Sequence, residues 1–483
     1  MSRRNRKKSE TYSGLERHVR VGKTLTPQLL TLPQLVLTSW IKDRLPDLLW
    51  AALIVVQRPR LEALDIFRQA LAFVRDDAVA QDRPLDVTLS GLAEWDGALR
   101  RQFIEKLAEL APDALIPLLL FDDLPSKDLW SLCLQGRPTE EHWNTVGEAV
   151  LAVIDHQSQE ATDCRWVRVI FQVIIGRMQF PKSMVNIAEE IFYYPDRGDP
   201  QAVRPTIRAS EGGLDALTGG QSAWPTNFWT QCMRDTVCIV DESIDSVAPI
   251  QVGTTVARVQ AVQRRLQNHS FETRMTTAVD PRHDIVFSSG LFALALVEEL
   301  LSPGIGQSLM GRMVVRSLSE VYISLSYLLT RENPDLWQTF RMYGAGQMKL
   351  SFLHLDRLGG AEFVDVNRLE ILANEDLWLE YLPVNLGHWS KATARTLAEE
   401  ANVKEVYDRF YPWGSAYVHG HWGAMRDSVM VTCFNPLHRL HRVPRSRARS
   451  LEDVVPDATL LADKVLERVE EAYPGFSFRL GVQ

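Results

Sequence analysis

Apolar side chains recur every three or four residues along most of the chain, the spacing that places them on one face of an α-helix. Between Pro33 and Pro195 this pattern predicts a series of short helices separated by proline or aspartate turns. Successive short helices of this kind indicate stacked helical hairpins around an apolar interior. The clearest of them are expected at Leu61–Val74, Leu99–Leu110, Lys127–Leu134, Val146–Ile154 and Trp166–Met178.

A second helical block is predicted from Pro281 to the carboxyl end. Proline inside a helix removes a hydrogen bond and clashes with the preceding turn, so Pro412 is expected to begin a new helix after Tyr411. The alternation typical of a strand is confined to Ser428–Phe434. The pattern therefore predicts an all-α protein, with an amino-terminal helical-hairpin domain and a carboxyl-terminal helical bundle.

The composition changes between Tyr194 and Ala223, where proline, glycine, aspartate and serine become frequent. Such a stretch is typical of a linker or an insertion. The predicted organisation has four parts. Residues 1–20 form a flexible basic arm, and residues 21–195 form an amino-terminal helical domain. Residues 196–280 form a connecting region, and residues 281–483 form a carboxyl-terminal bundle that carries the candidate site.

The totals describe an ordinary globular chain: 483 residues, 46% of them apolar and 24% charged, with a net charge of −8. The negative charge argues against a surface that binds nucleic acid as a whole. Five cysteines without a C-x-x-C pair fit a reducing compartment. The apolar runs are shorter than the ~20 residues that a membrane-spanning helix needs. A cytoplasmic protein that does not engage the membrane is expected.

Polar side chains that can carry chemistry lie at every fourth position of the segment Tyr407–His421. Tyr407, Tyr411, Ser415 and His419 would share one helix face. A histidine can act as a general acid or base near neutral pH, although a lone helical histidine more often makes a structural hydrogen bond. The surroundings of Ser415 lack the G-x-S-x-G turn, so serine hydrolase chemistry is not favoured.

Two opposite charges, Arg316 and Glu320, lie four residues apart within an apolar helical stretch. Such a pair is commonly a surface ion pair that contributes only tenths of a kcal/mol. The apolar surroundings equally fit a buried pair that faces an interior polar site, because buried charges need partners. The sequence leaves both interpretations open.

Histidines are dense near the carboxyl end, where His419, His421, His438 and His441 accompany Cys433. The spacings H-x-H and H-x-x-H can fit a metal, but neither an H-E-x-x-H motif nor paired cysteines accompany them. Residues 438–449 can also be a basic surface segment. No nucleotide-binding motif occurs, and we expect neither a metal nor another cofactor.

Several of these polar residues recur together in a family that the chain resembles over residues 285–445. This is an uncharacterised bacterial family of α-helical domains of unknown function, so the resemblance implies a helical domain without an assigned activity. The residues that carry the resemblance are Arg316 and Glu320 in R-x-x-x-E, Trp389 and Arg395 in HWSKATAR, Tyr407, Tyr411, and Ser415 and His419 in S-x-x-x-H-G.

The same residues more weakly resemble the HEPN superfamily of helical-bundle ribonucleases and toxins, which are often found in phage-defence and toxin–antitoxin operons. Those enzymes pair an arginine with a histidine a short, fixed distance later. Here the nearest arginine before His419 is Arg409, more than two helical turns away, and Arg316 would have to supply the charge from another helix.

Two functions are therefore weighed, and a third, a metal-dependent hydrolase built on the histidine cluster, is less favoured. The first is a metal-independent ribonuclease-like effector that binds RNA in the carboxyl-terminal domain, with His419 as acid or base and Arg316 or Arg409 stabilising the phosphorane. Its orienting residues would be Ser415, Tyr411 and Glu320. The second is a non-enzymatic helical adaptor or sensor, whose polar residues fix the helix register and whose amino-terminal domain binds a protein partner. The sequence does not indicate an oligomeric state.

Overall fold

The computed structural model describes residues 18–21, 24–27, 39–81, 84–178, 185–196, 200–218, 222–245, 247, 253–374, 382–439 and 441–481. Residues 1–17 of the predicted basic arm lie outside this set. The chain forms two compact units. Unit 1 combines the chain up to Ile239 with the segment Cys433–His441, and unit 2 combines Val240–Thr432 with the chain from Arg442 onward.

The division differs from the boundaries expected from composition. The described residues of 196–280, the predicted connecting region, contain three α-helices. The first two, α10 (Pro200–Thr218) and α11 (Trp224–Asp235), belong to unit 1, and the third, α12 (Val256–Thr273), belongs to unit 2. The chain also returns to unit 1 late, through Cys433–His441, a connection that no local composition change marks.

Unit 1 is a set of short helices around an aromatic core. The indole of Trp50, on α1, packs edge-to-face against Phe67 at 5.5 Å and Phe103 at 5.8 Å. All three side chains are fully buried. Besides α10 and α11, the helices are α1 (Leu49–Gln57), α2 (Arg60–Val79), α3 (Leu89–Ala93), α4 (Gly97–Leu110), α5 (Pro112–Leu115), α6 (Lys127–Cys133), α7 (His142–Ile154), α8 (Gln159–Ile174) and α9 (Val185–Phe192).

Charged side chains are buried at the centre of unit 1. Arg168, on α8, donates from Nε and Nη2 to Asp86, with its shortest bond 2.7 Å long, and from Nη1 to Glu211 of α10 at 2.8 Å. Glu211 also pairs with Arg44 and with Arg165. Because a buried charge is tolerated only when it is paired and hydrogen-bonded, this network ties α8 and α10 to the loop before α3.

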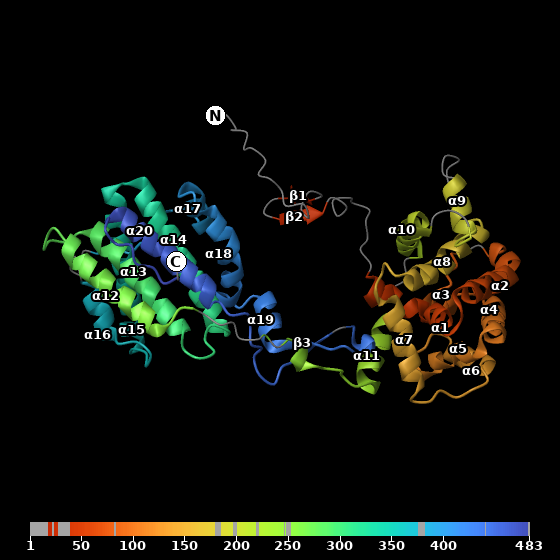
Figure 1. Ribbon diagram of the computed structural model, residues 1–483. Coiled ribbons are helices and arrows are strands. Elements are labelled where there is room, and N and C mark those ends of the chain that lie inside the picture. The colour runs from red at the N-terminus through yellow and green to blue at the C-terminus, as the bar shows by residue number, and fades with distance from the viewer. Residues whose placement is uncertain are drawn as a thin grey trace. The chain divides into compact units, whose positions relative to one another are not determined.

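Unit 2 is a bundle in which α14 (Leu309–Arg331) packs against α13, α17, α18 and α20. Its buried core includes Leu318, Tyr322, Leu325 and Leu466. Figure 1 shows the helices of each unit. Besides α12 and α14 they are α13 (Pro281–Leu300), α15 (Pro334–Leu358), α16 (Val366–Ala373), α17 (Ala394–Glu400), α18 (Lys404–Val418), α19 (Trp422–Val429) and α20 (Val455–Ala472).

Strands are few and short in the described part of the chain. β1 (His18–Val21) pairs antiparallel with β2 (Thr24–Pro27), and β3 (Met430–Thr432) pairs antiparallel with β4 (Arg442–Pro444). The second pair falls where alternation had indicated a strand. The all-α fold class is confirmed. Every described helix is too short or too polar to cross a lipid bilayer.

Replacing Arg168 by methionine should strongly destabilise unit 1. The substitution leaves Asp86 and Glu211 buried without their shared cation, a loss of about 3–5 kcal/mol in the free energy of unfolding. Urea unfolding followed by tryptophan fluorescence measures this loss. The matched control is Arg101→Met, which breaks an exposed pair with Glu105 at 3.9 Å and should cost less than about 1 kcal/mol. An equal loss in the free energy of unfolding for Arg168→Met and Arg101→Met would contradict a stabilising role for the buried network.

Candidate functional site

The candidate site lies where α14 and α18 approach each other most closely. A Cβ atom added to Gly414, on α18, would lie 2.6 Å from the Cβ of Arg316 and 3.2 Å from the carbonyl oxygen of Arg312, both on α14. Real Cβ atoms essentially never come as close as 2.6 Å to another heavy atom, and 3.2 Å is tighter than ordinary van der Waals contact. A glycine at this position therefore allows the two backbones to approach, and the approach places the Arg316 side chain against α18.

The helix that carries most of the candidate residues is continuous through Pro412, and the predicted break there is wrong. α18 runs from Lys404 to Val418 with Pro412 inside it. Buried side chains on both sides of the proline, Phe410 and Tyr417, pack against neighbouring elements. Tertiary packing thus holds the helix together despite the hydrogen bond that proline removes.

Arg316 is held by three partners. Its Nε donates to Ser415 Oγ at 2.8 Å, and its Nη1 donates to Glu320 Oε2 at 2.6 Å. The guanidinium carbon lies 3.4 Å from the centre of the Tyr411 ring, a cation–π contact. Arg316 is only 9% exposed, whereas the Glu320 side chain is 45% exposed. The pair thus joins a buried cation to a carboxylate at the surface. It is neither the surface ion pair nor the fully buried pair that the sequence left open, but lies between the two.

The tyrosines of α18 extend this cluster. The rings of Tyr407 and Tyr411 stack with their centres 4.7 Å apart. Burial raises the pKa of the Tyr411 hydroxyl, and the nearby Arg316 charge opposes that rise only in part. Tyr411 therefore stays a neutral phenol near pH 7, where it can support the arginine but does not act as a base.

His419 lies one turn beyond Ser415, at the carboxyl end of α18. Its backbone N–H donates to the Ser415 carbonyl at 3.0 Å, and the His421 N–H donates to the Ala416 carbonyl at 2.8 Å. Gly420 between them has a φ of 59°, so this is the left-handed glycine ending that closes many helices. The His419 ring is exposed and stacks on His421 at 5.8 Å. With the described residues it makes no hydrogen bond or ion pair.

Arg409, the other candidate cation, engages different partners. It is exposed, and its Nη2 lies 3.3 Å from Asp457 Oδ1 on α20. Of the six candidate catalytic residues, the structure thus brings Arg316, Glu320, Tyr411 and Ser415 into contact. It places His419 on the next turn and directs Arg409 to α20. A catalytic role for any of them stays a prediction.

Residues 300–435 match a family of unknown function, DUF5677. No curated protein and no solved structure matches the chain. The match contains Arg316, Glu320, Tyr411, Ser415 and His419. It confirms that the carboxyl half of the chain carries a domain of an uncharacterised family, and it assigns no activity to that domain.

Exposed apolar side chains gather at the end of the DUF5677 region. Trp422, Met425 and Val429 are 58%, 44% and 40% exposed, and their spacing places them on one face of α19. On α18, Trp413 and Val418 are also about half exposed. The sequence-based interpretation missed this surface, although the helical spacing of Trp422, Met425 and Val429 could have indicated it.

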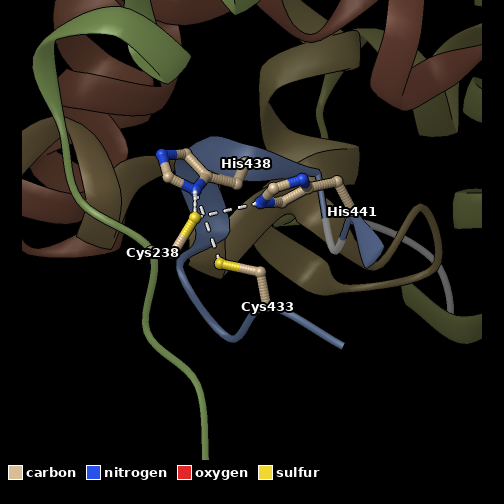
Figure 2. Close-up of side chains that lie close together, drawn as sticks. All are labelled: Cys238, Cys433, His438 and His441. Atoms are coloured by element: carbon tan, nitrogen blue, oxygen red, sulfur yellow. Dashed lines mark hydrogen bonds between the residues drawn. The ribbon is translucent and has the colours of Figure 1, made fainter. Parts of the chain in front are cut away.

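The histidines near the carboxyl end do not form one group. Among the described residues, the group with metal-ligand geometry is Cys238, Cys433, His438 and His441, all of unit 1, shown in Figure 2. The DUF5677 match includes Cys433 but ends before both of these histidines. In the sequence, Cys433, His438 and His441 lie close together, with the spacing Cys433-x₄-His438-x₂-His441. The fourth residue, Cys238, is distant in the chain and becomes apparent only in the folded structure.

Replacing Gly414 by alanine should force α14 and α18 apart. The new methyl group would meet the Arg316 Cβ and the helix backbone, so we expect a loss of about 1–3 kcal/mol in the free energy of unfolding. Chemical denaturation measures it. Gly344→Ala is the control, because that glycine lies exposed within α15 with open space around it. There alanine should stabilise by up to about 1 kcal/mol through its higher helix propensity. If Gly414→Ala left the free energy of unfolding unchanged, the close approach of α14 and α18 would not contribute to stability.

Proposed function

We propose that the protein is a non-enzymatic helical adaptor whose DUF5677 region binds a protein partner. The observation that carries this proposal is the engagement of Arg316 by Ser415, Glu320 and Tyr411. These contacts join α14 to α18, so the arginine acts as a clamp that fixes the relative position of the two helices. A rigid pair of helices is a suitable base for a binding surface.

The same contacts argue against a role for Arg316 at a phosphate. A catalytic arginine must present its donors to the charge that develops in the transition state. Here Nε and Nη1 donate to protein oxygens, and the face of the guanidinium lies on the Tyr411 ring. The Glu320 carboxylate further neutralises the charge. Recruiting Nε or Nη1 of Arg316 to a substrate would require breaking the clamp.

The surface that the clamp supports is the exposed face of α19. α18 contacts both α14 and α19, so the position of α19 follows from that of the clamped pair. Exposed tryptophan and methionine are enriched at the centres of protein interfaces. In unit 1 the apolar residues mostly form the core. The expectation that the amino-terminal domain contributes partner contacts stays a prediction.

The partner-binding surface can be tested with Trp422→Asp. A partner captured by the full-length protein is purified and its dissociation constant is measured by calorimetry. Trp422→Asp should weaken binding at least tenfold, since a buried interface tryptophan often contributes more than 1.4 kcal/mol. Phe363→Asp is the matched control, because Phe363 is 87% exposed and lies on the turn between α15 and α16. Equal binding by both variants would remove α19 from the proposal.

A second candidate is the metal-independent ribonuclease-like effector, favoured by one observation. The His419 imidazole is exposed one turn beyond Ser415, stacked on His421 and three residues before the exposed Trp422. Single-stranded RNA is bound by stacking its bases on aromatic rings, and histidine can move a proton near pH 7. The likeness to HEPN-type ribonucleases and a role in phage defence belong to this candidate.

Arg316→Lys and His419→Ala separate the two functions. For an adaptor, Arg316→Lys should lower the free energy of unfolding by about 1–3 kcal/mol, because lysine keeps the charge but loses the fork that joins Ser415 and Glu320. His419→Ala should change it by less than about 0.5 kcal/mol.

The companion measurement is incubation of the purified wild-type protein with single-stranded RNA in the presence of a chelator. Intact RNA is the expected result for an adaptor. RNA cleavage that His419→Ala abolishes and His421→Ala preserves would overturn the adaptor proposal and establish the effector.

A further inference from the structure

We propose that Cys238, Cys433, His438 and His441 form a structural zinc site in unit 1. Each of the four residues offers one ligand atom, and these atoms all lie within 4.8 Å of one another. Figure 2 shows the two sulfur atoms and the two imidazole rings converging on one small volume. The ligands come from a segment just after α11 and from the late return of the chain to unit 1.

Three sulfur–nitrogen distances among the donor atoms are close to those of a zinc tetrahedron. Zinc–sulfur bonds of about 2.3 Å and zinc–nitrogen bonds of about 2.0–2.1 Å, at tetrahedral angles, place sulfur and nitrogen ligands about 3.6 Å apart. Here Cys238 Sγ lies 3.6 Å from His438 Nδ1 and 3.3 Å from His441 Nε2. Cys433 Sγ lies 3.4 Å from His438 Nδ1. The side chains therefore need little movement to accept the ion.

The hydrogen bonds around His438 fix the tautomer that a metal requires. Thr236 Oγ1 donates its one hydrogen to the Cys232 carbonyl at 2.7 Å and accepts from Asn435 Nδ2 at 3.2 Å. Its contact with His438 Nε2, at 2.9 Å, must then be an N–H donated by the imidazole. His438 Nδ1 is left with a lone pair that faces both sulfur atoms, as in protein zinc sites whose other ring nitrogen is held by an outer partner.

The backbone holds the ligand segments together independently of the ion. The Cys433 N–H donates to the His441 carbonyl at 2.9 Å, and the Phe434 N–H donates to the Ile239 carbonyl at 2.8 Å. The Asn435 side chain donates to the Val237 carbonyl at 2.8 Å. These bonds pair the return segment with the residues around Cys238, so all four donors are positioned before a metal arrives.

The chemistry of the donor set selects the ion and its role. Two thiolates and two neutral imidazoles in a tetrahedron are typical of Zn²⁺, and two thiolates neutralise its charge. Four protein ligands leave no open position for water or substrate, which is typical of a structural site. A Cys238–Cys433 disulfide would instead leave the lone pair of His438 Nδ1 facing sulfur atoms that carry no hydrogen to donate, and both cysteines are free thiols in the structure.

Metal analysis of the full-length protein tests the site. Protein purified without chelator should contain one zinc ion per chain. The Cys238→Ser variant should contain no zinc. Because Cys238 is exposed, the substitution should not unfold the protein, and the loss of zinc would then report the loss of a ligand. Cys133→Ser is the matched control, because Cys133 is a free thiol outside the group, and it should retain one zinc ion. Circular dichroism confirms that the three proteins fold alike.

Cobalt substitution tests the ligand geometry. Reduced, metal-free protein titrated with Co²⁺ should develop the intense visible absorption of tetrahedral cobalt together with a thiolate-to-metal charge-transfer band. Thr236→Val should weaken zinc binding by roughly 10–100-fold, because it removes the acceptor that orients His438, whereas Thr236→Ser should restore the affinity.

Three results would overturn the proposal. They are wild-type protein that takes up no zinc after loading, a weak octahedral cobalt spectrum, and a Cys238→Ser variant that binds zinc as tightly as the wild type. Mass spectrometry that finds a Cys238–Cys433 disulfide in the purified protein would assign the thiols to that bond instead. None of these results bears on whether the protein is an adaptor or a ribonuclease.

Discussion

The close approach of α14 and α18 at Gly414 determines what the Arg316 cluster can do. With the backbones this near, the Arg316 side chain has to run along α18, where Tyr411 offers a ring face and Ser415 offers an oxygen. The cation is thereby largely buried, and its Nε and Nη1 donate to protein oxygens. A buried arginine paired in this way fixes geometry well and serves poorly as a free positive charge. This constraint, more than the presence of an arginine and a histidine on neighbouring helices, is the reason for proposing an adaptor.

The sequence predicted the helices well because each depends on local periodicity. α4 and α6 begin and end within two residues of the predicted bounds, because their apolar side chains repeat at helical spacing, and Asp96 caps the start of α4. Pro412 was misjudged because a local rule was overridden by long-range packing: Phe410 and Tyr417 anchor α18 on either side of it. Proline weakens a helix locally, and a buried face can outweigh that loss.

The candidate site was predicted only in part, for a related physical reason. The positions of Tyr411, Ser415 and Glu320 relative to Arg316 follow from spacing of four residues on two helices that pack together. His419 was expected on the same face, but the glycine that follows it ends the helix and leaves its ring in solvent. The contacts of Gly414, the buried network of Arg168 and the convergence on Cys238 all depend on pairs of residues distant in sequence. No local pattern encodes them.

The late return of the chain to unit 1 has an energetic cost that the proposed zinc ion would help to offset, together with the backbone hydrogen bonds of the returning segment. Among the described residues of the segment Cys433–His441, Leu437 lies in the unit 1 core. Burying a leucine contributes about 1.5–3 kcal/mol. Ordering the described residues of this segment costs about 1–2 kcal/mol each. A structural zinc ion contributes about 10–16 kcal/mol in small zinc-dependent folds, which is of the size needed to offset that cost. Cys238, Cys433 and His441 lie at or next to the three points where the chain passes between the two units, so a metal there would hold the unit 1 end of each crossing.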